Sequence, residues 1–166
     1  ENKFKKYTNS KECVAVDSGT AALHLALNVT DIYKKEVLVP SLTFASTIHA
    51  IKYNGGIPIF VDIKPDTLCI DPVDLENKIT SKSKVILPVH FGGYPCDMNS
   101  LKKISKKKNL TIVEDAAHAC GSKYNGKRVG SLGDMTCFSF HPVKNLSMPK
   151  GGAITINKKS KVLKNK

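Results

Sequence analysis

Lys144 stands where a lysine can act as a nucleophile toward a carbonyl carbon. The run from Met135 to Phe140 is typical of a strand, and Pro142 cannot donate a hydrogen bond to a neighbouring strand. Lys144 should therefore lie just past a strand's carboxyl end, where open α/β sheets bind ligands. A lysine held there among apolar neighbours can lose its proton and attack a carbonyl. The alternative is one more surface lysine in a lysine-rich chain.

A carboxylate and an imidazole are expected at the same edge of the sheet. The run from Leu110 to Val113 is typical of a buried strand, and it leads directly into Asp115. His118 follows three residues later. A carboxylate at a strand end can pair with a basic ring nitrogen of a ligand, whereas a buried histidine with satisfied hydrogen bonds is the alternative for His118.

A third feature could bind an anion. A short strand, Glu12 to Val16, is followed by Ser18-Gly19-Thr20 and then by a strong helix former that starts at Ala21. The first turn of a helix has free backbone N–H groups, which bind phosphate readily, and the Thr20 hydroxyl adds a donor. A plain helix cap without a ligand is the alternative.

These residues together match the needs of pyridoxal phosphate. Its aldehyde requires a lysine, its ring nitrogen requires a carboxylate that keeps it protonated, and its phosphate requires amides and hydroxyls. Ser139, at the end of the strand before Lys144, would supply a further hydroxyl. Phe44, in the first turn of a helix expected from about Thr43 to Tyr53, could stack on the ring or fill the core.

Strands and helices alternate along the chain, which predicts the elements that position these residues. The predicted strands cover residues 12–16, 36–40, 57–61, 84–89, 110–113, 135–140 and 152–156. The helices between them cover about 21–27, 43–53, 72–79 and 97–107. Because the strands are continuous apolar runs, we predict an α/β fold: a three-layer αβα sandwich with a mostly parallel seven-stranded sheet. Residues 1–157 should form one domain, and 158–166 an exit segment.

The formal charge of +12 suggests nucleic acid as a partner, but the pattern of charges argues against it. Most of the excess lysines fall on a helix after Asp97 and in the last ten residues. They lack interleaved aromatic residues, and Arg128 is the only arginine of the sequence. Solvated faces explain the charge better than a nucleic-acid site, although a basic field also attracts anionic substrates.

Composition also bears on location and on metal binding. No apolar run approaches the ~20 residues that a membrane span needs, and no secretory start is seen. The five cysteines are odd in number and widely spaced, so they suggest neither a disulfide framework nor a zinc site. We therefore expect a cytoplasmic protein without a metal site.

Several motifs, in order, resemble the sugar aminotransferases of the DegT/DnrJ/EryC1/StrS family. They are S-G-T-A-A-L-H-L-A-L, V-P-S-L-T-F-A-S-T, F-V-D-I-K-P-D-T, V-E-D-A-A-H-A, G-D-M-T-C-F-S-F-H-P-V-K-N-L and G-G-A-I. They cover nearly the whole chain and are jointly very specific. The resemblance implies a fold-type-I domain that binds pyridoxal 5'-phosphate (PLP), preceded by a lead-in and followed by a small domain outside this stretch.

The resemblance also assigns roles, beginning with the two catalytic residues. Lys144 would form a Schiff base with the cofactor and then move protons, and Asp115 would pair with the pyridinium nitrogen. The remaining residues would contact the cofactor: His118 on the ring face or phenolic oxygen, Phe44 stacked on the ring, and Gly19, Thr20, Ala21 and Ser139 around the phosphate.

The implied reaction moves an amino group from glutamate or glutamine to a nucleotide-linked keto-sugar, in a homodimer with a shared active site. One departure from the family is Met148-Pro149-Lys150, which replaces a common Gly-Glu pair. Two rivals remain open at this point. One is a PLP-dependent sugar dehydratase, which carries histidine in place of the lysine and is disfavoured by Lys144. The other is a catalytically silent relative or fragment that keeps the fold.

Overall fold

A seven-stranded sheet forms the centre of the protein. The computed structural model describes residues 1–157, so the exit segment predicted for 158–166 lies outside the described residues. The strands lie in the order β1 (Glu12–Val16), β9 (Gly152–Ile156), β8 (Met135–Ser139), β5 (Thr111–Asp115), β4 (Ser83–Ile86), β2 (Glu36–Pro40) and β3 (Ile57–Val61). β9 runs antiparallel to both of its neighbours, and the other four pairs are parallel. The mostly parallel sheet predicted from the sequence is confirmed.

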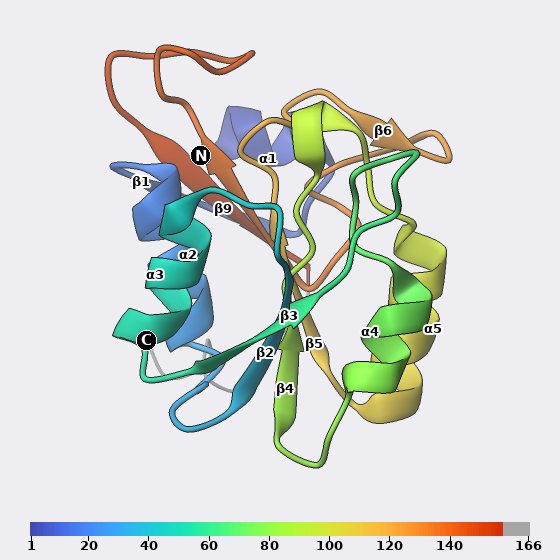
Figure 1. Ribbon diagram of the computed structural model, residues 1–166. Coiled ribbons are helices and arrows are strands. Elements are labelled where there is room, and N and C mark those ends of the chain that lie inside the picture. The colour runs from blue at the N-terminus through green and yellow to red at the C-terminus, as the bar shows by residue number, and fades with distance from the viewer. Residues whose placement is uncertain (158–166) are drawn as a thin grey trace.

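Helices cover both faces of the sheet (Figure 1). One face carries α2 (Gly19–Asn28) and α3 (Ala45–Tyr53), and the other carries α4 (Pro72–Lys78), α5 (Met98–Lys108) and the short α1 (Asn2–Thr8). Side chains of the inner strands alternate between two cores. Val37 and Val39 join the core beneath α2 and α3, whereas Leu38 joins the core beneath α4 and α5. The period of two along a strand therefore buries both faces, which confirms the three-layer sandwich.

Most element boundaries follow from the local chemistry expected of them. Ser18, Asp71 and Asp97 each cap a helix by accepting a hydrogen bond from a backbone N–H of its first turn. The Asn125-Gly126 pair, with both residues at positive φ, turns a small hairpin of β6 (Lys123–Tyr124) and β7 (Lys127–Arg128).

Two strands end earlier than predicted. β4 ends at Ile86 rather than Val89, because Pro88 has no N–H with which to continue the ladder, and Val89 then makes only an isolated bridge to Asp115. β8 ends at Ser139, one residue early. Beyond it the Phe140 N–H bonds the Gly151 carbonyl and the Phe140 carbonyl accepts from the Met148 N–H, which closes the base of a loop of residues 141–150.

Candidate active site

Asp115 ends β5 on the face that α2 and α3 cover. Only 5% of the residue is exposed. Its Oδ2 accepts a hydrogen bond of 2.8 Å from the Thr47 hydroxyl, and its Oδ1 accepts one of 3.1 Å from the Ala117 N–H. The carboxylate is thus held by an element 68 residues away in sequence and by its own turn. This is a fixed negative charge at the carboxyl edge of the sheet.

Gly19 and Ser139 form a narrow cradle between β8 and the start of α2. A Cβ on Gly19 would lie 2.7 Å from the Ser139 Cβ, so only glycine lets the two backbones approach this closely. Within residues 1–157 the backbone N–H groups of Gly19 and Thr20 have no hydrogen-bond partner. The Ala21 N–H, in contrast, is occupied by the Ser18 hydroxyl at 3.1 Å. Two amides and two hydroxyls therefore remain for an anion, fewer than the sequence predicts.

Lys144 lies in the loop that follows β8 and is half-buried. Its backbone N–H bonds the His141 carbonyl at 2.8 Å, and the adjacent Asn145 donates through its side chain to the Cys120 carbonyl. The second bond ties the lysine loop to the segment after Asp115. In Figure 1 the same loop, in orange-red, extends beyond the edge of the sheet.

His118 connects the lysine and the carboxylate electrostatically. Its pKa is lowered from the usual value, first because burial disfavours the charged imidazolium and second because the positive charge of Lys144 is near; the negative charge of Asp115 opposes both effects. Part of the ring stays exposed, and it meets Phe91 edge-on with ring centroids 6.4 Å apart. The charges of Lys144 and Asp115 thus both lie near enough to the imidazole to act on its pKa, in opposite directions.

Phe44 does not fill the core, and it does not lie in the first turn of its helix as the sequence predicts. It is the N-cap of α3, in extended conformation, and 77% of it is exposed. The helix begins one residue later because Phe44 already has β-type backbone angles. An exposed ring of this size on the same helix start as Thr47 offers a flat surface to a ligand.

Two features of the site were missed in the sequence. The first is Thr47, whose signal was the Thr43–Thr47 spacing of four at a helix start. The second is the buried hydrogen-bond network of Glu114, whose side chain lies on the opposite face of β5 from that of Asp115. Glu114 is fully buried and accepts hydrogen bonds from the His90 ring, the Gly133 N–H and the Thr136 hydroxyl.

The departure at Met148-Pro149-Lys150 places a cation beside the cradle. The Lys150 ammonium lies 3.3 Å from the Asp17 carboxylate, and both side chains are largely exposed. The hydrogen bond from Lys150, followed by that from Ser18, lowers the pKa of Asp17. The pair links the lysine loop to the residue that precedes the helix cap of α2.

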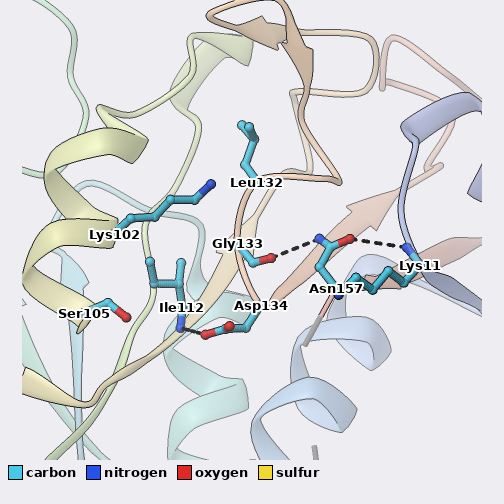
Figure 2. Close-up of a pocket in the computed structure, with 8 residues that line it drawn as sticks. All are labelled: Lys11, Lys102, Ser105, Ile112, Leu132, Gly133, Asp134 and Asn157. Atoms are coloured by element: carbon cyan, nitrogen blue, oxygen red, sulfur yellow. Dashed lines mark hydrogen bonds between the residues drawn. The ribbon is translucent and has the colours of Figure 1, made fainter. Parts of the chain in front are cut away.

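Two hollows of the surface lie away from the predicted site. One lies at the opposite, amino edge of the sheet, and Figure 2 shows its polar groups turned toward each other. There Asn157 donates to the Gly133 carbonyl at 3.0 Å, and Asp134 accepts from the Ile112 N–H at 2.9 Å. The second hollow lies beside Tyr33 and Tyr53. Neither contains a residue of the predicted site.

Two further findings concern metals and membranes. Among residues 1–157, no three side chains of His, Cys, Asp or Glu are grouped so that they could hold a metal ion. In the same part of the chain, no helix has the length and apolar character needed to cross a membrane.

The donor set fits PLP. The Gly19–Ser139 cradle, which a single Cβ would fill, leaves free amides and hydroxyls for a phosphate. The buried Asp115 carboxylate suits a protonated ring nitrogen, the exposed Phe44 suits the ring face, and the amine of the half-buried residue Lys144 suits an aldehyde.

Solved structures define the class of the fold. The chain superposes on the Streptococcus pneumoniae protein Spr1654 in its PLP form with a TM-score of 0.92 and 38% identity, over 98% of this chain and 45% of that one. It superposes equally well, with a TM-score of 0.93 and 36% identity, on an aminotransferase from Psychrobacter cryohalolentis, over 96% of this chain and 41% of that one. The protein therefore has the α/β sandwich of these aminotransferase structures.

The sequence comparison gives the family. The chain belongs to the DegT/DnrJ/EryC1/StrS aminotransferase family, whose profile matches residues 1–164. It is 44% identical over 161 residues to the GDP-perosamine synthase of Escherichia coli O157:H7, covering 96% of this chain and 44% of that protein. It is 47% identical over 159 residues to the dTDP-3-amino-3,6-dideoxy-alpha-D-galactopyranose transaminase of Aneurinibacillus thermoaerophilus, covering 95% of this chain. The chain spans less than half the length of either relative.

Proposed function

We propose that the protein of which this chain is part transfers an amino group from glutamate or glutamine to a nucleotide-linked keto-sugar, with PLP as its cofactor. The observation that carries the proposal is the Gly19–Ser139 cradle, which lies at the same edge of the sheet as the buried Asp115 carboxylate. Lys144 follows the same strand as Ser139, and its charge and that of Asp115 both act on the pKa of His118. The names of the two relatives, a GDP-sugar enzyme and a dTDP-sugar transaminase, support a sugar nucleotide as the amino acceptor.

Each residue of the edge has a distinct task in this proposal. PLP would supply an aldehyde, held by the Lys144 amine until the amine of the donor displaces it, and a protonated ring that would withdraw electrons from the donor Cα. Asp115 would keep a proton on the ring nitrogen, and Phe44 would cover one face of the ring. Once displaced, the free Lys144 amine would take the proton from the donor Cα and return it, which is general acid–base work by a positioned amine.

The remaining residues would bind the cofactor and orient it. The amides of Gly19 and Thr20, with the hydroxyls of Thr20 and Ser139, hold the phosphate. The Ala21 amide joins them only if it leaves the Ser18 hydroxyl. His118, which its surroundings keep neutral near pH 7, contacts the ring or its phenolic oxygen as an uncharged group.

We also propose a homodimer whose partner completes the site. Large apolar side chains are exposed on three loops at the carboxyl edge: Phe44 after β2, Tyr94 after β4, and Val143, Leu146 and Met148 after β8. Exposed apolar groups gathered at one edge favour burial against another protein surface. As the location we propose the cytoplasm, whose reducing conditions suit the five free cysteines.

Absorbance of the natural full-length protein mixed with PLP tests the cofactor role. We expect a visible band from the bond between Lys144 and PLP, and we expect Lys144→Ala to abolish it. Lys127→Ala, which changes an exposed lysine of the small hairpin, serves as the control and should keep the band. The absence of a band in the wild type would favour the catalytically silent alternative.

A panel of donors and acceptors tests the reaction itself. The protein is incubated with glutamate or glutamine and with GDP- and dTDP-linked keto-sugars, and the sugar nucleotides are analysed by mass spectrometry. The proposal predicts the mass change for replacement of a carbonyl oxygen by an amino group, and no such product with Lys144→Ala. A protein that shows the PLP band but aminates none of these sugars would contradict the proposed acceptor class.

A further inference from the structure

Thr47 is the one side chain from another element that bonds the Asp115 carboxylate within the described residues. Its hydroxyl donates to Asp115 Oδ2 at 2.8 Å, and the residue is fully buried. An ionised carboxylate only accepts hydrogen bonds, so the single proton of the Thr47 hydroxyl points at Asp115. A hydrogen bond to a charged group is stronger than one between neutral groups, and this one is shielded from water.

A second hydroxyl supports the first. Thr43, just before α3, donates through Oγ1 to the Thr47 Oγ1 at 2.8 Å. Because the Thr47 hydroxyl donates its hydrogen bond to Asp115, the lone pairs of its oxygen can accept a hydrogen bond from the Thr43 hydroxyl. The two hydroxyls therefore form a chain with one direction, Thr43 to Thr47 to Asp115, in which each bond polarises the next.

The same helix turn also carries the exposed aromatic ring. Phe44 is the N-cap of α3, and its carbonyl accepts a hydrogen bond of 3.0 Å from the Thr47 N–H. One turn of backbone and one side-chain hydrogen bond thus connect the backbone of Phe44 to the Asp115 carboxylate.

We propose that Thr47, supported by Thr43, is a positioning residue that orients the Asp115 carboxylate toward the ring nitrogen of the cofactor and fixes its spacing from Phe44. This inference rests on the proposed function, because it concerns the same PLP site. The inference goes beyond the proposed function because it assigns the orientation of Asp115 to a hydroxyl on α3 that would not itself contact the cofactor.

The test compares two cofactors with several variants of the full-length protein. Dissociation constants are measured for PLP and for its carbocyclic analogue, in which a C–H replaces the ring nitrogen. Thr47→Val keeps the shape of the side chain and removes the hydroxyl, and Thr47→Ser keeps the hydroxyl. Thr155→Val is the matched control, since Thr155 is also fully buried, makes one hydrogen bond to the Gly130 carbonyl, and lies on the opposite face of the sheet.

We expect Thr47→Val to weaken PLP binding about tenfold or more, because the Asp115 carboxylate is no longer held toward the ring nitrogen and its charge-assisted hydrogen bond to that nitrogen is weakened. Thr47→Ser should stay within about threefold of the wild type, and Thr155→Val should leave PLP binding unchanged. The analogue has no ring nitrogen to pair with Asp115, so the wild type and Thr47→Val should bind it equally. The melting temperature of the PLP-free protein should fall by similar amounts in Thr47→Val and Thr155→Val.

Other outcomes would overturn the inference. Equal PLP affinity of wild type and Thr47→Val would show that the hydroxyl does not orient the carboxylate, and an equal loss for both cofactors would show a purely structural role. Should Thr47→Val fail to fold, Thr43→Val replaces it: a loss of about threefold confined to PLP supports the hydroxyl chain, and no loss refutes it. If the wild type itself binds no PLP, the proposed function is refuted as well. The wild-type measurement alone shows this, so this failure is distinguished from a failure of the inference about Thr47.

Discussion

Two adjacent carboxylates of β5, Glu114 and Asp115, are held in opposite ways on the two faces of the sheet. Glu114 is completely enclosed and accepts from three donors, one each from His90, Gly133 and Thr136. The His90 ring is itself fixed, since its Nδ1 accepts from the Cys96 N–H and its Nε2 therefore carries the proton given to Glu114. Among the donors of residues 1–157, two reach the Asp115 carboxylate, which lies at the carboxyl end of the strand.

The different number of donors to these two carboxylates shows how one strand can carry a structural residue on one face and a ligand-binding residue on the other. A carboxylate has about four lone-pair sites, and a buried one that is well supplied with donors serves packing. A carboxylate with capacity left over, placed at a strand end, can accept one more hydrogen bond from a ligand. Glu114 therefore locks β5 to β8 and to the loop after β4, whereas Asp115 remains available at the edge.

The largest effect should come from removing Glu114. Glu114→Ala leaves the His90 ring, the Gly133 N–H and the Thr136 hydroxyl buried without a partner, and we expect it to lower the free energy of unfolding by about 3–5 kcal/mol. Asp115→Ala should lower it by about 1–3 kcal/mol, since it leaves one buried hydroxyl unpaired. Urea unfolding of the full-length protein measures both free energies of unfolding. Of the variants that still fold, Asp115→Ala should lose PLP binding and Glu114→Ala should keep it. Equal destabilisation by the two variants would break the comparison.

A second, smaller effect concerns the cradle on the Asp115 side. In Gly19→Ala the new Cβ overlaps the Ser139 Cβ, and relieving such a clash costs about 1–3 kcal/mol. Since the amides of this turn would have to shift, we expect PLP affinity to fall about tenfold, while Ala in the first turn of α2 costs the helix nothing. Titration with PLP measures the loss. Ser139→Ala removes the hydroxyl and keeps the Cβ, so it measures the share of affinity that the hydroxyl itself supplies. The double variant Gly19→Ala/Ser139→Gly relieves the clash and should regain part of the affinity lost by Gly19→Ala.

The smallest effect is a titration shift at His118. Burial and Lys144 lower its pKa and Asp115 raises it, so Lys144→Gln should raise the pKa, Asp115→Asn should lower it further, and Glu114→Gln should leave it unchanged. NMR titration of the His118 ring protons measures each shift.

The direction in which stability depends on pH follows from the lowered pKa of His118. The folded protein binds a proton at His118 less readily than the unfolded chain does, so the contribution of His118 to stability is lost as the pH falls below the ordinary histidine value of about 6.5. Lys144→Gln should reduce that loss, because it removes one of the causes. An unchanged His118 pKa in Lys144→Gln would show that the charge of Lys144 does not act on His118, and would argue against placing the lysine at this site.

Much of the site's framework could be predicted because it depends on short-range patterns. The apolar runs, the Pro142 stop and the capping residues Ser18, Asp71 and Asp97 are local signals, and each gave its element within a few residues. The catalytic and binding roles themselves stay predictions until the experiments above are done.

The sequence by itself determined the order of strands and helices, the family, and the residues that strand ends would gather. Only the tertiary structure decided that Gly19 presses against Ser139, that the Ala21 amide is already occupied, and that Thr47 holds Asp115. Those contacts join residues as far as 120 positions apart (139 minus 19), and their distances depend on the register of the sheet and on how α2 and α3 pack on it. Local patterns carry no information on such spacings, because a shift of one or two ångströms changes which donor meets which acceptor without changing any helix or strand.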